Sequence, residues 1–378
     1  MPPSPPRVHA DSPQTAVPTR AVEPGRTRRI AVAAPPLPAS ALQRRARVVL
    51  YYKSADAAAL WEEAVWAKES LSEAVADHPE MAGRLRRRAA DGSWEVKLND
   101  AGVRFVNATA EAAVDEFLAD ERRRESWEAA LAPWADVNAD DPDMCALFYL
   151  QLTRFQGDTG YAVGVSCSLL LCDPLSLARF LLSWARTHAE MKANDHKRAT
   201  NPLMQYARYF QRPDAMAVRP LAKSIPLDDT PPAGAGDDDS RTAAVETTVL
   251  FRARAGGAGK DAPVDHRTLA AACVARVSER LGGDAPPRFS VVVGDGREGM
   301  SIETACTADD AQPGSSSGQH ELEVAQWQEL GLEELVLRDS KPVHVSFSIV
   351  TSCGDEGVAV VMPDGDAGDF LVTATITK

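Results

Sequence analysis

In the first half of the chain, apolar runs typical of buried strands alternate with segments whose apolar residues recur at helical spacing. An uninterrupted apolar run over 46–52 predicts a buried strand. Apolar residues at helical spacing predict a helix between Ala55 and Ala76. The pair Asp91-Gly92 predicts a turn between two short strands. The same patterns predict further elements, namely strands over 103–106, 146–155 and 160–168 and helices over 110–121 and 175–193.

The second half repeats this mixture of strand-like and helix-like patterns. One helix is predicted over 266–281, with its apolar residues on one face. Around it the pattern predicts five strands, over 245–254, 288–293, 342–350, 357–362 and 369–377. Because both halves combine strands with helices, we expect a two-domain α/β protein with mixed sheets.

Shifts in composition divide the chain into four parts. Ten prolines within the first 38 residues exclude a regular helix, so residues 1–40 are predicted to form a Pro- and Arg-rich, partly extended arm. Residues 41–193 and 246–378 then form the two domains. Residues 194–245 are rich in Pro, Asp, Gly and Arg, and they are predicted to be a crossover linker.

The charge of the chain limits its partners. The 378 residues carry a net charge of −13, although eight arginines against Asp11 and Glu23 make residues 1–50 basic. An acidic body argues against nucleic acid as the main partner. The apolar runs are too short to span a bilayer, and no signal-like segment opens the sequence. The six cysteines stand singly, which argues against a zinc site and favours reduced cytosolic thiols.

The most informative segment runs from Tyr161 to Trp184. A buried apolar stretch leads to Asp173, and a helical pattern closing in Trp184-Ala follows. This segment resembles the central motif of the plant BAHD acyltransferases, in which a strand ends in H-x-x-x-D-G. Asp173 matches the motif aspartate, but Leu169 stands where the family has histidine, and Pro174 stands where it has glycine. None of the seven histidines has an aspartate four residues further on.

Other segments resemble BAHD motifs in the expected order. They are 71–85, 99–106, 150–157, 293–297 and 341–346. The family's D-F-G-W-G motif falls on 336–340 and is absent, and the second domain is expected to be shortened. Residues 15–26 and 99–104 are most similar to the eceriferum-type branch, which is associated with very-long-chain fatty-acid elongation for cuticular wax.

The resemblance implies a chloramphenicol-acetyltransferase-like fold with an interdomain channel. In the family, the motif histidine removes a proton from an acceptor, which then attacks the thioester of acyl-CoA. Leucine cannot take a proton, so no catalytic base is assigned at Leu169, and the candidate substitutes are His344 and Cys172. The family aspartate is structural and pairs with an arginine of the second domain. Asp173 and Arg297 are therefore the expected pair.

Three functions remain open after this comparison of motifs. The first is a weakly active or inactive acyl-handling accessory in very-long-chain fatty-acid and cuticular-wax metabolism, with acyl-CoA as ligand and a fatty-acid elongase condensing enzyme as partner. The second is an active O- or N-acyltransferase that uses acyl-CoA and a different base. The third is a decayed, non-functional homologue. In each case we expect a monomer without a metal or a bound cofactor, in the cytoplasm or at the surface of the endoplasmic reticulum.

Two glycine motifs are rejected as sites. Residues 294–299 satisfy G-x-G-x-x-G, but a dinucleotide site needs a helix to open there, and the polar residues that follow lack helical spacing. Residues 314–318 satisfy G-x-S-x-G, but a nucleophile elbow needs a strand before it and a helix after it. This stretch is a Ser/Gly loop.

Overall fold

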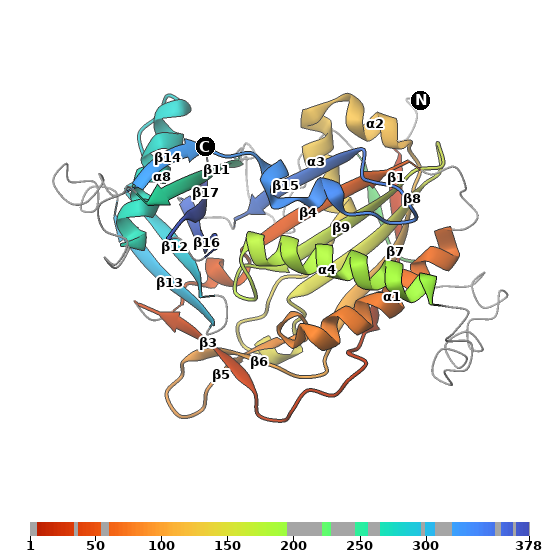
Figure 1. Ribbon diagram of the computed structural model, residues 1–378, viewed down its shortest axis with the longest axis horizontal. Helices are drawn as coiled ribbons and strands as arrows, with labels where there is room; N and C mark the ends of the chain where they lie inside the picture. Colours follow the sequence, from red (N-terminus) through yellow and green to blue (C-terminus); the bar gives the residue numbers. More distant parts are fainter. Residues whose placement is uncertain are drawn as a thin grey trace.

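Two β-sheets and their covering helices make up the protein (Figure 1). The computed structural model describes residues 6–33, 37–53, 60–194, 221–227, 246–255, 265–295, 299–306, 320–351, 357–365 and 368–377. Both sheets mix parallel and antiparallel neighbours, as the sequence predicts.

The first sheet holds the strand that leads to Asp173. The strands of this sheet are, from one edge to the other, β10 (Leu221–Pro226), β1 (Arg7–Asp11), β7 (Val103–Ala110), β8 (Phe148–Phe155), β9 (Tyr161–Ser168), β4 (Arg45–Tyr52) and β15 (His344–Val350). A short strand, β2 (Gln14–Ala16), also pairs with β7. The motif strand β9 is therefore central, with β8 and β4 on its two sides.

The second sheet has more strands than the first and includes most strands of the second half of the chain. Its order is β14 (His320–Val324), β11 (Glu246–Ala255), β17 (Phe370–Thr377), β16 (Gly357–Pro363), β12 (Arg288–Asp295), β13 (Gly299–Cys306), β3 (Thr27–Val32), β6 (Trp94–Lys97) and β5 (Arg84–Arg87). The turn expected at Asp91-Gly92 joins β5 to β6, and Gly92 has a positive φ of 68°. A residue with a side chain would be strained in that conformation.

Helices cover both faces of the first sheet. The longer ones are α1 (Leu60–Asp77), α2 (Val114–Ala119), α3 (Glu121–Leu131), α4 (Pro174–Ala193) and, on the second sheet, α8 (His266–Arg280). Single turns of 3₁₀ helix lie at Ala39–Leu42, Pro79–Ala82, Pro142–Met144, Trp327–Leu330 and Leu332–Glu334. Figure 1 shows α1 and α4 side by side across one face of the first sheet.

Alternation along β4 explains why this sheet has helices on both sides. Leu50 belongs to the core formed with α1 and α4, whereas Tyr51 belongs to the core formed with α2 and α3. Successive side chains of a strand point to opposite faces, so a continuous apolar run is buried on both. The apolar pattern over 46–52 therefore predicts the layering as well as the strand.

Strands from the two halves of the chain cross between the sheets. β15 follows the linker in sequence but pairs with β4 in the first sheet. β3, β5 and β6 precede the linker but lie in the second sheet, where β3 pairs in parallel with β13. The two sheets therefore do not separate at residues 194–245, and β10, within that range, joins the first sheet.

Three segments differ from the predicted elements. Residues 7–32 of the expected arm form β1, β2 and β3, and the prolines at 12–26 lie between these strands, where no ladder hydrogen bond is lost. The helix predicted over 110–121 is replaced by the end of β7 and by α2 and α3. Residues 299–306, over which no strand is predicted, form β13, which pairs antiparallel with β12, so a helix does not follow the G-x-G-x-x-G residues.

Candidate functional site

A tight turn carries the chain from β9 into α4. The backbone N–H of Leu169 donates to the carbonyl of Arg44 at 3.0 Å, and that of Leu171 donates to Ser168 at 3.0 Å. Asp173 then caps the helix, because its Oδ1 accepts from the backbone N–H of Ser176 at 2.8 Å. Pro174 occupies the first helical turn, where its missing N–H has no cost.

Leu169 lies inside the main core and is only 1% exposed. An apolar side chain in this position offers no atom that could accept a proton. Neighbouring Leu170 and Leu171 are equally buried. The turn formed by these three leucines is therefore an apolar part of the core.

Asp173 lies against the second sheet. Its Oδ2 would be 2.6 Å from a Cβ placed on Gly294 of β12, so a larger residue at position 294 would collide with the carboxylate. The same Oδ2 accepts a hydrogen bond from the Ser176 hydroxyl at 2.7 Å. Arg297, the expected partner, is outside the described residues, and so are 314–318; the Asp173–Arg297 pair stays a prediction.

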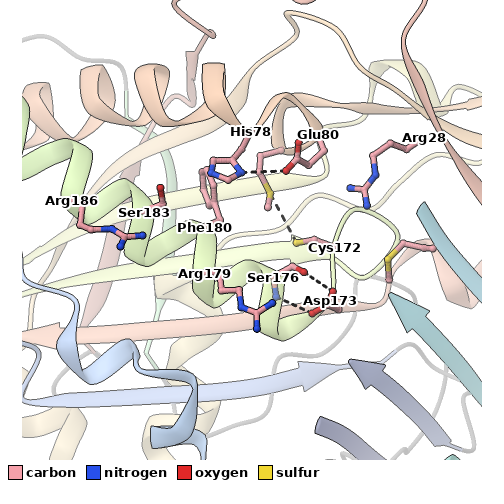
Figure 2. A pocket seen from close by; sticks show the side chains of 12 residues that line it. Arg28, His78, Glu80, Cys172, Asp173, Ser176, Arg179, Phe180, Ser183 and Arg186 are labelled. Carbon is pink, nitrogen blue, oxygen red and sulfur yellow. Dashed lines mark hydrogen bonds and ion pairs between the residues drawn. The ribbon is translucent and has the colours of Figure 1, made fainter. Parts of the chain in front are cut away.

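A cavity of about 440 Å³ opens beside this turn, between α4 and the segment that follows α1 (Figure 2). One face of α4 lines it with Ser176, Arg179, Ser183 and Arg186, spaced three, four and three residues apart. This spacing keeps the four side chains on one side of the helix. The remaining lining residues are Arg28, His78, Glu80, Met81, Cys172, Asp173, Phe180 and Met300.

A histidine–carboxylate pair faces α4 across the cavity (Figure 2). His78 Nδ1 lies 3.4 Å from Glu80 Oε1, and the ring packs edge-on against Phe180 with centroids 5.4 Å apart. The hydrogen bond with Glu80 raises the pKa of His78, although partial burial opposes this. Burial alone would raise the pKa of Glu80, but the hydrogen bond from His78 and other contacts lower it.

Positive side chains outnumber negative ones around the cavity. The lining includes three arginines, Arg28, Arg179 and Arg186, and two carboxylates, Glu80 and Asp173. The Arg28 Nη1 group donates to the Leu171 carbonyl at 3.4 Å, which ties the cavity to the motif turn. Such a cluster of guanidinium groups suits phosphate or carboxylate oxygens.

The structure places the two candidate substitute bases differently. Cys172 borders the cavity but is 4% exposed, and its Sγ lies 3.5 Å from that of Cys167. The contact with the Cys167 thiol and burial raise the pKa of Cys172, which disfavours the reactive thiolate. His344 begins β15, packs 5.9 Å from the Tyr51 ring and does not border the cavity; burial lowers its pKa.

Sequence reasoning missed His78, Glu80 and the arginines of α4 as possible site residues. His78 and Glu80 stand in a segment that resembles a family motif without a histidine of known role. The sequence signal for the site is the spacing of the polar residues of α4, which are three, four and three positions apart. A polar stripe of this kind ordinarily indicates a helix face exposed to solvent. Only the packing of the 78–81 segment opposite this face turns it into a cavity wall.

Two further features are absent from the described part of the chain. Among those residues, no cluster of three histidines, cysteines or acidic residues could hold a metal ion. None of the helices in those ranges combines the length and apolar character that crossing a membrane requires.

Two mixed sheets, with a strand-to-helix turn capped by Asp173, make this an α/β protein. A family model described as "Transferase family" matches residues 45–252, which is more than half of the chain. The chain belongs to this family, that of the BAHD acyltransferases.

Two plant proteins are among the curated relatives. The chain is 34% identical over 116 residues to agmatine hydroxycinnamoyltransferase 1 of Oryza sativa subsp. japonica, covering 31% of this chain and 24% of that one. It is 33% identical over 144 residues to Protein ECERIFERUM 26-like of Arabidopsis thaliana, covering 38% and 31%. The match therefore spans less than a third of each relative's length.

Solved structures of similar outline include vinorine synthase and F. graminearum TRI101. Vinorine synthase has a TM-score of 0.46 and 15% identity, over 98% of this chain and 95% of that one. TRI101 complexed with coenzyme A and T-2 mycotoxin has a TM-score of 0.43 and 12% identity, over 89% and 92%.

Proposed function

We propose that this BAHD-family protein binds acyl-CoA but transfers the acyl group weakly or not at all. The observation that carries the proposal is the buried leucine at position 169, in the turn whose later residues, Cys172 and Asp173, border a cavity with a polar and cationic lining. Loss of a general base typically costs about 10²–10⁴ in rate. Binding of acyl-CoA does not require a general base.

The cavity supports an anionic ligand of this kind. Arg28, Arg179 and Arg186 can bind the phosphates of coenzyme A, because guanidinium groups form paired, charge-assisted hydrogen bonds with phosphate oxygens. Phe180 and Met300 give the same cavity apolar surface that suits a pantetheine or acyl chain.

The biological setting of the proposal is acyl elongation. Part of this chain is similar to Protein ECERIFERUM 26-like, and its motifs resemble the branch associated with cuticular wax. We place the protein beside a fatty-acid elongase condensing enzyme, as a monomer in the cytoplasm or at the surface of the endoplasmic reticulum. Co-purification of the full chain with the condensing enzyme tests this setting.

A second candidate function is slow acyl transfer with a different base. The observation that favours it is His78, which borders the cavity and has its Nδ1 held by Glu80. An imidazole fixed by a carboxylate through one nitrogen can accept a proton at the other.

Calorimetric titration with acyl-CoAs of short to very long chain tests the proposal, with transfer and release of coenzyme A followed in the same samples. Binding without turnover is expected. Arg179→Ala and Arg186→Ala should each weaken binding about tenfold, the factor that corresponds to ~1.4 kcal/mol. Arg122→Ala, an exposed arginine of α3, is the matched control and should bind normally.

The other outcomes are also informative. Turnover that disappears in His78→Gln would establish the second candidate function. If no acyl-CoA binds, both functions are wrong. If binding is unaffected by the arginine substitutions, the ligand does not occupy this cavity.

A further inference from the structure

Among the residues that the structure describes, two groups combine serine, histidine and glutamate, one buried and one at the surface. The buried group is Ser70, His188 and Glu63, between α1 and α4. His188 Nδ1 lies 3.0 Å from Ser70 Oγ, and its Nε2 lies 2.7 Å from Glu63 Oε1. This order of nucleophile, base and carboxylate is the arrangement of a catalytic triad.

The buried group has a structural role. Ser70 is 0% exposed and His188 is 2% exposed, so a substrate cannot reach them. The Ser70 hydroxyl donates to the Ala67 carbonyl at 3.1 Å and accepts from Trp184 Nε1 at 3.0 Å. Its proton is therefore directed at the helix backbone and not at the imidazole.

The surface group is Ser224 on β10, His9 on β1 and Glu111 directly after β7. These strands are neighbours in the first sheet, and His9 pairs directly with Ser224 in the register. His9 also pairs with Thr109, two residues before Glu111, so the three side chains share one face. The His9 side chain is 26% exposed and that of Glu111 is 42% exposed, which leaves the group accessible.

Hydrogen-bond partners fix where the protons lie. Glu111 Oε1 lies 2.8 Å from His9 Nε2, and a carboxylate only accepts, so Nε2 carries the proton. In the neutral ring, Nδ1 is then an acceptor, and it lies 3.1 Å from Ser224 Oγ. The serine hydroxyl therefore donates to the imidazole, as a nucleophile activated by a base must.

Arg7 completes this arrangement. Its Nε donates to Ser224 Oγ at 2.6 Å and its Nη2 donates to the Ser224 carbonyl at 2.8 Å. Because Oγ accepts from the guanidinium, its own hydrogen is free to point at His9. The positive charge also favours the alkoxide that forms when the proton leaves. The backbone N–H of Arg7 donates to Glu111 Oε2 at 3.0 Å and holds that carboxylate in place.

We propose that Ser224, His9 and Glu111 form a second, nucleophilic site that accepts acyl groups from small activated esters and thioesters. Ser224 Oγ attacks the acyl carbonyl carbon while its proton passes to His9 Nδ1. The carbon–oxygen or carbon–sulfur bond of the donor then breaks, and the leaving group takes the proton from His9. Water then attacks the acyl carbon, and its proton passes to His9 Nδ1. The bond between the acyl carbon and Ser224 Oγ breaks, and Oγ takes this proton as the free acid leaves. This site is separate from the cavity at Asp173, so it does not depend on the function proposed above.

Labelling of the full chain with a fluorophosphonate tests the proposal. In this reaction an Oγ–P bond forms, the P–F bond breaks, and the serine proton passes to His9 as fluoride leaves. Mass spectrometry of the peptides is expected to locate one label, on Ser224. Ser70 is the matched internal control and should stay unlabelled because it is buried.

Two variants separate a reactive site from a structural one. Ser224→Ala should abolish labelling, and His9→Gln should slow it at least tenfold, since a general base contributes about 10²–10⁴. Absence of the label from Ser224, or a labelling rate that does not change in His9→Gln, would overturn the proposal.

Discussion

The side chain at position 169 is set by its surroundings as well as by the motif. Leu169 follows β9 directly, its backbone is fixed to Arg44, and its side chain is enclosed by the main core. An imidazole placed there would be removed from water and would need a hydrogen-bond partner for each nitrogen. The turn has thus adapted to an apolar residue.

Leu169→His is therefore expected to lower the free energy of unfolding by about 1–3 kcal/mol, the cost of an unsatisfied buried polar group. Because Leu169 does not border the cavity, the substitution should also leave acyl transfer unimproved. Urea denaturation and the transfer assay measure the two effects. Leu169→Met, which conserves volume, is the control and should cost less than about 1.5 kcal/mol. A stable and active Leu169→His variant would contradict this account.

The pair formed by His78 and Glu80 predicts a dependence of stability on pH. The raised pKa of His78 stabilises the fold below its unfolded value of 6.5 and loses this effect as pH rises through the folded value. The lowered pKa of Glu80 stabilises the fold above 4.5 and loses its effect at lower pH. The two contributions overlap between these values.

Glu80→Gln should lower the pKa of His78 toward 6.5, as followed by the imidazole proton signals in NMR spectra. The same variant should lose more stability at pH 5.5 than at pH 8.5. An unchanged titration of His78 in Glu80→Gln would show that the pair is not formed in solution.

At the scale of elements, buried polar contacts join α1 to α4. Glu63 Oε2 accepts from Lys192 at 2.7 Å and lies 3.9 Å from Arg338 Nε. Although burial opposes ionisation, hydrogen bonds from His188 and Lys192 keep the pKa of Glu63 below its ordinary value. Buried charges persist only when paired and hydrogen-bonded in this way.

Ser70→Ala should lower the free energy of unfolding by about 1–3 kcal/mol, because Trp184 Nε1 and His188 Nδ1 would each lose a buried partner. Ser126→Ala is the matched control. Ser126 lies in α3, and its hydroxyl also bonds the carbonyl three residues earlier, but it is exposed to solvent. Thermal or chemical denaturation compares the two. Equal costs would mean that the network contributes little.

The loop in place of the D-F-G-W-G motif is also fixed by polar contacts. Tyr52 and Tyr161 stack with centroids 4.7 Å apart. Their hydroxyls donate to the Leu335 and Leu337 carbonyls at 3.0 and 3.2 Å. The first sheet therefore holds this loop although the family motif is absent from its sequence.

At the scale of the whole molecule, exchange of strands couples the two sheets. β15 supplies an edge to the first sheet and β3 supplies an interior strand to the second, and each comes from the opposite half of the chain. If one half of the chain unfolds, the sheet formed mainly by the other half loses a hydrogen-bonded strand. We therefore expect one cooperative folding unit.

Calorimetry should show a single unfolding transition for the full chain, with equal calorimetric and van't Hoff enthalpies. A chain cut within the linker should keep both pieces associated at neutral pH, because β15 and β3 remain paired across the cut. Two separate transitions, or free dissociation of the pieces, would show that the halves fold independently.

Much of the local structure could be predicted from sequence. Apolar periodicity located β4, β8, β9, α1, α4 and α8 to within a few residues of their ends in most cases, because burial of one face or both faces sets the spacing. The short strands β1, β2 and β3 were not predicted. Their few residues lie among prolines, and they are strands only because existing sheets accept them.

The sequence by itself determined the family, the mixed α/β class, the apolar residue at position 169 and the helix cap at Asp173, since each depends on residue identity at fixed spacing. Only the tertiary structure decided which strands cross between the sheets, that Cys172 is buried, and that His78 faces the arginines of α4. It also brought Ser224 next to His9, 215 residues away. These contacts join distant segments through sheet register and packing, which local spacing does not encode.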